Sequence, residues 1–117
     1  MAPVNKHLLV CICFVCAMDL SAQPHSLELT GGDKVSLVGE GWISTSRYER
    51  DFAVSPNGNE VFYTLQMPQN SFQTILYTHK NAAGKWSDPV VAPFAGRYSD
   101  LEPAFSNDGQ KLFFVSN

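Results

Sequence analysis

Residues 51–66 read DFAVSPNGNEVFYTLQ, which places two largely apolar segments on either side of a short polar turn. Pro56 presets the backbone φ for a turn, and Gly58 tolerates the left-handed conformation that closes it. The segment after the turn, residues 60–66, is rich in the β-branched and aromatic residues typical of strands. The stretch therefore predicts a β-hairpin with strands over residues 51–55 and 60–66.

The same pattern returns 51 residues later, where residues 101–116 read LEPAFSNDGQKLFFVS. Each copy has a strand, a turn of the form S-x-[ND]-G and a returning aromatic strand, and two such copies indicate an internal repeat. The aromatic pairs of the returning strands are interpreted as packing within the blades. The aligned residues are Asp51 with Glu102, Ser55 with Ser106, Asn57 with Asp108, Gly58 with Gly109, Phe62 with Phe113, and Tyr63 with Phe114.

Two more strands are predicted between the copies. Residues 74–79 (TILYTH) form the third, and the fourth lies within residues 87–94, where Pro89 and Pro93 restrict it to a sheet edge. A short strand is also considered at residues 26–30. No segment after the N-terminal region has apolar residues at helical spacing, so no helix is predicted there.

The two copies resemble the WD40-like β-propeller repeat of exported bacterial proteins, as found in the TolB propeller. The resemblance is carried by ERDFAVSPNGNEVFYT at 49–64 and DLEPAFSNDGQKLFFVS at 100–116, and it extends to GWISTSRYERDF at 41–52 and GKWSDPVVAPF at 84–94. It implies an all-β fold in which residues 41–117 hold about one and a half four-stranded antiparallel blades. The first blade would cover about 48–95, and the second would begin at about 99–117.

A propeller needs about four to eight blades, so this region is expected to be an incomplete propeller. A lone blade leaves apolar faces and strand edges uncovered, which favours self-association through those edges. Three interpretations follow: a fragment of a longer protein, a truncated gene product, or a piece that assembles with copies of itself.

The N-terminal residues 1–22 have the pattern of a secretory signal peptide. Lys6 precedes an apolar run at residues 8–18, and the small residues of Leu20-Ser21-Ala22 follow, so cleavage is predicted after Ala22. Eleven apolar residues are too few for a membrane span, which needs roughly 20. The mature chain is therefore expected to have no membrane span, to begin with a lead-in at residues 23–40, and to reside in the periplasm or outside the cell.

Composition excludes several classes of function. The chain of 117 residues has a formal net charge of −3 and only eight scattered Lys and Arg residues, which argues against a nucleic-acid partner. All three cysteines lie in the apolar run of the signal peptide, so the mature chain has no disulfide or thiolate metal site. His25 and His79 lie far apart without ligand spacing, so neither a metal nor a cofactor is predicted.

The candidate binding residues are Arg50, Asp51 and Glu102. Asp51 and Glu102 occupy equivalent positions near the starts of strands that would line a propeller channel, where their carboxylates would face a ligand. The alternative is that each carboxylate bonds backbone groups of its own blade, as short acidic side chains often do. Trp42 and Trp86 offer stacking surfaces for a glycan, although packing between strands is the more common role of such residues.

No catalytic residues are predicted. The favoured function is a non-catalytic binding module for a protein or small ligand, and the resemblance to TolB implies a protein partner in the cell envelope. The alternative is a piece of an enzyme, either a glycan-acting propeller hydrolase or a propeller beside a peptidase domain, because one fold hosts many functions.

Overall fold

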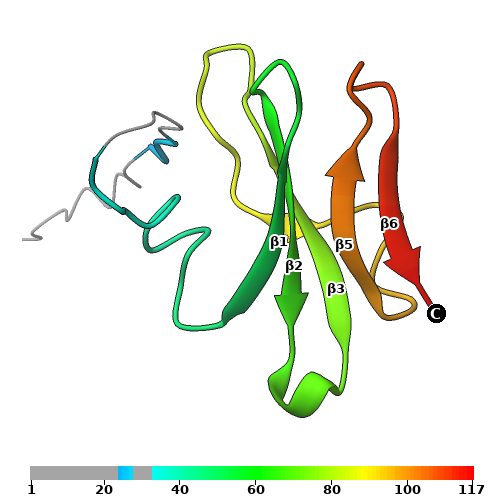
Figure 1. Ribbon diagram of the computed structural model, residues 1–117. Helices are drawn as coiled ribbons and strands as arrows, with labels where there is room; N and C mark the ends of the chain where they lie inside the picture. The colour runs from blue at the N-terminus through cyan, green and yellow to red at the C-terminus, as the bar shows by residue number, and fades with distance from the viewer. Residues whose placement is uncertain (1–23, 28–32) are drawn as a thin grey trace, which may run out of the picture.

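The computed structural model describes residues 24–27 and 33–117, and over these residues the chain is all-β. The predicted signal peptide and most of the strand considered at 26–30 lie outside the described residues. A four-stranded antiparallel sheet has the order β1-β2-β3-β4, and a two-stranded sheet pairs β5 with β6 (Figure 1). The strands are β1 (Tyr48–Val54), β2 (Glu60–Gln66), β3 (Gln73–His79), β4 (Val90–Val91), β5 (Asp100–Phe105) and β6 (Leu112–Ser116).

The predicted strands are confirmed with small shifts of their ends. β2 has the predicted bounds, and β1 begins three residues earlier than expected. The predicted edge strand is confirmed but shortened to Val90–Val91, because Pro89 and Pro93 limit it on both sides. The prediction of no helix was wrong in one detail, since a single 3-10 turn (η1, Pro68–Asn70) connects β2 to β3.

The two repeat turns have the same hydrogen bonds. The Ser55 hydroxyl donates to Asn57 Oδ1 at 2.7 Å and accepts from the Glu60 amide at 2.9 Å. Its counterpart Ser106 donates to Asp108 Oδ1 at 2.6 Å and accepts from the Lys111 amide at 3.0 Å. The sequence repeat is therefore also a repeat of local structure.

The turns also lie against each other. A Cβ added at Gly109 would be 2.9 Å from Pro56 Cδ, closer than side chains approach without movement. Gly109 has φ of +70°, the same value as Gly58, so glycine suits this position by conformation as well as by space. The second hairpin therefore lies beside the first with its turn at the same end.

β2 lies at the centre of the core and buries both faces. Val61 and Tyr63 pack with Ile43 and Trp86 on one face, while Phe62 packs with Ile75 and Ala92 on the other. This division follows from the alternation of side chains along a strand. Phe105 and Leu112 of the second sheet contact the Phe62–Ile75–Ala92 cluster, and this contact joins the two sheets.

The expected packing of the second aromatic pair was wrong. Phe62 and Tyr63 of β2 are buried, but Phe113 and Phe114 of β6 are exposed. β2 is covered on both sides by β1 and β3, whereas β6 is paired only with β5 among the described residues. Phe114 still stacks on Phe94, with ring centroids 4.8 Å apart.

Candidate functional site

The two acidic residues aligned by the repeat lie at two equivalent β-bulges. The register of β1 with β2 shifts between Arg50 and Ala53, and that of β5 with β6 shifts between Leu101 and Ala104. Asp51 and Glu102 lie within these irregularities with φ of +55° and +56°. A bulge changes the direction of side chains by adding one residue to a strand. The same distortion therefore determines the direction of both carboxylates.

The structure brings all three predicted binding residues together. Arg50 Nε is 2.9 Å from Asp51 Oδ2, and Arg50 Nη2 is 3.6 Å from Glu102 Oε1. Arg50 Nη1 also donates to Gln66 Oε1 at 3.3 Å. The guanidinium thus lies between two carboxylates that are 51 residues apart in the sequence. We call Arg50, Asp51, Glu102 and Gln66 the arginine cluster.

The alternative was that each carboxylate bonds backbone groups of its own repeat. The described contacts of Asp51 and Glu102 include no such hydrogen bond. Asp51 Oδ2 is buried and makes no hydrogen bond, so its partner is the Arg50 charge alone. Another acid, the buried Asp100, has the backbone-bonding role, because its Oδ2 accepts from the Gly96 amide at 3.0 Å. Both carboxylates of the arginine cluster are therefore held by charge, and the exposed pair of Arg50 with Glu102 contributes about 0–1 kcal/mol.

A hydrogen bond from its own backbone amide also positions Glu102. The Glu102 amide donates to Thr64 Oγ1 at 3.0 Å, and Thr64 is fully buried in β2 directly opposite Arg50. This hydrogen bond connects the bulge of the second sheet to the centre of the first. It places Glu102 beside Arg50 even though the Glu102 side chain is itself exposed.

A small pocket of about 220 Å³ lies beside the cluster, and its lining includes Ser44, Glu49, Arg50, Asp51 and Tyr63. Burial, with a smaller contribution from the Glu49 carboxylate, raises the pKa of Tyr63 to about 12. The Tyr63 phenol is therefore neutral at physiological pH. The ionic groups of the pocket are Glu49, Arg50 and Asp51, which together favour a ligand with positive charge.

The charged groups of the arginine cluster contact one another directly. Its charged groups are two carboxylates and one guanidinium, and Arg50 contacts both carboxylates. Over residues 24–27 and 33–117, no group of three or more His, Cys, Asp or Glu side chains could hold a metal ion. Reversible charge pairing is what the arrangement supports.

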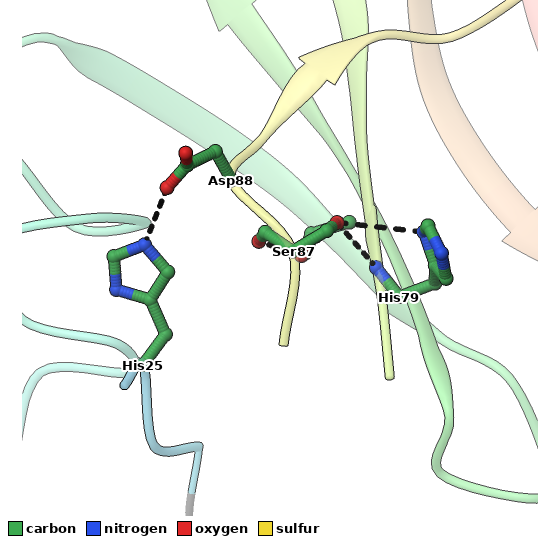
Figure 2. A network of polar contacts seen from close by, with 5 residues as sticks. His25, His79, Ser87 and Asp88 are labelled. Atoms are coloured by element: carbon green, nitrogen blue, oxygen red, sulfur yellow. Dashed lines mark hydrogen bonds and ion pairs between the residues drawn. The ribbon is translucent and has the colours of Figure 1, made fainter. Parts of the chain in front are cut away.

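A second set of polar side chains gathers where β3 faces residues 85–88 (Figure 2). His25 Nε2 lies 2.7 Å from Asp88 Oδ1, and Ser87 Oγ lies 3.4 Å from His79 Nδ1. These residue types are those of a catalytic triad, but Asp88 contacts His25 rather than the histidine beside Ser87. Among the contacts of residues 24–27 and 33–117, no acid bonds to His79, so these residues do not form the Ser-His-Asp relay that a serine nucleophile uses.

The tryptophans differ in their exposure. Trp86 is buried in the core, which confirms packing as its role. Trp42 is partly buried and stacks on His25 with ring centroids 4.4 Å apart, and it lies 6.2 Å from Trp86. The faces that a sugar would use are thus occupied by protein at Trp86 and partly occupied at Trp42.

Sequence reasoning missed Gln66 and Thr64, which hold the cluster in place. Gln66 was assigned only as the end of a strand, and Thr64 as a strand residue. The only sequence signal for Thr64 is its position, because residue 64 lies opposite residue 50 once the turn sets the hairpin register. The contact between Thr64 and Glu102 needs the second sheet and has no local signature.

Within the described ranges, no helix has the length and apolar character needed to cross a membrane. Comparisons with known proteins found no matching family model, no matching curated protein and no matching solved structure.

Proposed function

We propose that this chain is an exported, non-catalytic binding module built from propeller-type repeats, and that the arginine cluster is its binding site. The observation that supports the site most directly is the convergence of Arg50, Asp51 and Glu102 from two equivalent bulges. The blade interpretation is supported by the repeated turn geometry and by a four-stranded antiparallel first sheet.

The chemistry of the cluster defines the kind of partner. Arg50 neutralises one carboxylate, so the cluster keeps an excess of negative charge, and Glu49 in the adjoining pocket adds to it. A partner that presents a lysine or arginine would pair with Glu102 and Asp51 and would displace little protein structure. The resemblance to TolB-type propellers indicates a protein partner in the cell envelope.

A capture experiment tests the site. The full chain is immobilised and exposed to envelope extract, alongside an Asp51→Asn/Glu102→Gln double variant and an Asp33→Asn control. Asparagine tolerates the left-handed backbone at residue 51, so the fold should survive. We expect one or more proteins to be retained by the wild type and by the control, and recovered at least about tenfold less by the double variant. Absence of any specific partner, or equal recovery by the double variant, would overturn the proposal.

Export is tested separately. If residues 1–22 are a signal peptide, the protein isolated from its native cells begins at Gln23 and lies outside the cytoplasm. Mass spectrometry of its N-terminal peptide reads this directly. A product that keeps Met1 and fractionates with cytoplasm would contradict export, and it would leave the result of the capture experiment unaffected.

A further inference from the structure

The turn between β1 and β2 contains the one Asn-Gly pair of the sequence, Asn57-Gly58. The side-chain amide of an asparagine can be attacked at Cγ by the backbone nitrogen of the next residue. The attack is least hindered when that residue is glycine, because glycine has no Cβ. Asn57 is exposed, so water can reach its side chain. The pair therefore has the chemistry of a deamidation site.

Deamidation here would take two steps that consume water and release ammonia. In the first step the Gly58 nitrogen bonds to Asn57 Cγ, the bond from Cγ to Nδ2 breaks, and the Gly58 proton leaves with Nδ2 as ammonia. In the second step water adds to a carbonyl of the resulting succinimide ring and opens it. Opening at one carbonyl gives aspartate, and opening at the other gives isoaspartate, which adds a methylene group to the main chain.

The closed turn holds both of the groups that would react. The Gly58 N–H donates to the Ser55 carbonyl at 2.8 Å, so the nitrogen is not free to lose its proton. Asn57 Oδ1 accepts from the Ser55 hydroxyl at 2.7 Å and from the Asn59 amide at 3.0 Å. Donors to Oδ1 would by themselves favour attack at Cγ, because they stabilise the negative charge that develops on that oxygen. Without a free nucleophile this activation has no effect, so the turn must open before the reaction begins.

The second repeat shows how the aspartate product would fit. Asp108 has the position equivalent to Asn57, and its Oδ1 accepts from the Ser106 hydroxyl at 2.6 Å and from the Gln110 amide at 3.0 Å. These are the same two kinds of hydrogen bond that Asn57 Oδ1 accepts. An aspartate at residue 57 would therefore keep both of them, whereas isoaspartate would change the spacing of the backbone between them.

We propose that Asn57 is a site of deamidation that reacts only while its turn is open, and that the aspartate product closes again into the turn seen at Asp108. The change replaces a neutral amide with a carboxylate and makes the two turns chemically equivalent. It adds one negative charge at the end of the hairpin, where Pro56 lies against Gly109 of the second turn.

The wild-type chain tests the dependence on opening through two rates measured at the same pH and temperature. Deamidation is followed by mass spectrometry of the digested peptide that spans residue 57, which gains about 1 Da. It is measured in the folded full chain and in the full chain unfolded in urea. Exchange of the Gly58 amide hydrogen is measured by NMR, because the same opening must free that N–H.

We expect folding to slow deamidation at Asn57 by the same factor, to within about tenfold, as it slows exchange of the Gly58 amide. Deamidation faster than this would mean that Asn57 reacts inside the closed turn, and slower deamidation would mean that a different opening controls it. Either discrepancy would overturn the proposal. Absence of the reaction in the urea-unfolded chain would overturn it too.

The repeat supplies a matched pair of variants. Ser55→Ala removes the hydroxyl bonds of the first turn and should speed deamidation at Asn57 at least about fivefold, the effect of a net hydrogen bond on an opening equilibrium. Ser106→Ala removes the same bonds from the second turn and should leave the rate at Asn57 nearly unchanged. Equal acceleration by both variants would assign the reaction to global unfolding. If Ser55→Ala does not fold, the two wild-type rates still decide.

An Asn57→Asp variant tests whether the product fits the turn. At neutral pH it should unfold at the same urea midpoint as the wild type, and the Asn59 amide should keep the exchange protection that its hydrogen bond to Oδ1 gives. A lower midpoint, or loss of protection at Asn59, would show that the turn does not accept aspartate and would overturn that part of the proposal.

Discussion

At the scale of single residues, the two bulge positions combine a structural demand with a charge. Asp51 and Glu102 both adopt a left-handed backbone, which costs an ordinary L-residue roughly 1–2 kcal/mol. Aspartate tolerates this conformation better than glutamate does. The left-handed backbone at residue 102 would thus be more stable with a residue such as aspartate or glycine. The Glu102 carboxylate, however, completes the arginine cluster.

Substitution at residue 102 should separate these two demands. Glycine relieves the left-handed conformation but loses more entropy on folding and removes an exposed ion pair, so Glu102→Gly should change the free energy of unfolding by no more than about 1 kcal/mol. Glu102→Val forces a β-branched residue into that conformation and should be about 1–2 kcal/mol less stable than Glu102→Gly. Urea unfolding measures both, and equal stability of the two variants would argue against the bulge geometry.

The two turns should differ in their response to acid. The Ser106 hydroxyl, followed by the Gln110 amide, donates to the Asp108 carboxylate and lowers its pKa below the ordinary value of 3.8. A carboxyl whose pKa is lower in the folded state stabilises above its unfolded pKa, and this contribution is lost as the pH falls through the lowered value. Asn57 has the equivalent position in the first turn and does not titrate.

We therefore expect acid below pH 3.8 to loosen the 106–111 turn while the 55–60 turn remains unchanged. The amide signals of Gln110 and Asn59 in an NMR pH titration report on the two turns separately. The variant Asp108→Asn copies the first turn and should remove the pH dependence. A parallel response of both turns in the wild type would contradict the assignment of the effect to Asp108.

At the scale of the elements, one side-chain hydrogen bond links β2 to the bulge of β5. Thr64 Oγ1 accepts the Glu102 amide from within a fully buried position. Thr64→Val has nearly the same shape but leaves that amide without an acceptor, which should lower the free energy of unfolding by about 1–3 kcal/mol. Thr64→Ser keeps the hydroxyl and serves as the control.

Chemical denaturation of the two variants distinguishes this hydrogen bond from simple packing. If Thr64→Ser, which loses a methyl group, proves less stable than Thr64→Val, packing decides the position and the inter-sheet hydrogen bond contributes little. If Thr64→Val is the less stable variant, the hydrogen bond decides the position. Loss of that hydrogen bond should then also weaken capture of the envelope partner, because Glu102 would no longer be fixed beside Arg50.

At the scale of the whole molecule, stability depends on the contact between the two sheets. Ile75 is fully buried, and its cluster with Phe62 and Ala92 is contacted by Phe105 and Leu112 of the second sheet. Ile75→Ala should cost about 2–5 kcal/mol, as large-to-small changes in a core do. Because the cavity would lie at the junction, both sheets should lose protection in hydrogen exchange.

A matched surface change should leave stability nearly unaltered. Val90 lies in the edge strand β4 and is largely exposed, so Val90→Ala should shift the free energy of unfolding by about 0.5 kcal/mol or less. Thermal unfolding followed by circular dichroism compares the two variants. Loss of exchange protection in the first sheet alone, with β5 and β6 unchanged in Ile75→Ala, would show that the sheets fold independently.

The sequence by itself determined the strands and the repeat. The turn chemistry of Pro56 and Gly58, the aromatic strands that follow each turn, and the offset of 51 residues are local features, so β2 was predicted to the residue and the equivalence of Asp51 with Glu102 was evident. Pro89 and Pro93 marked the weak edge strand for the same reason, because proline removes a backbone donor wherever it occurs.

Only the tertiary structure decided which groups meet. A bulge forms where one strand has one residue more than the strand paired with it. The contacts of Glu102 with Arg50 and with Thr64 depend on how one sheet packs on the other. Burial is likewise a property of neighbours, so the aromatic pairs of β2 and β6 read alike in sequence although one is buried and the other exposed. A strand's pattern specifies which side chains can be covered, and the surrounding strands decide whether they are.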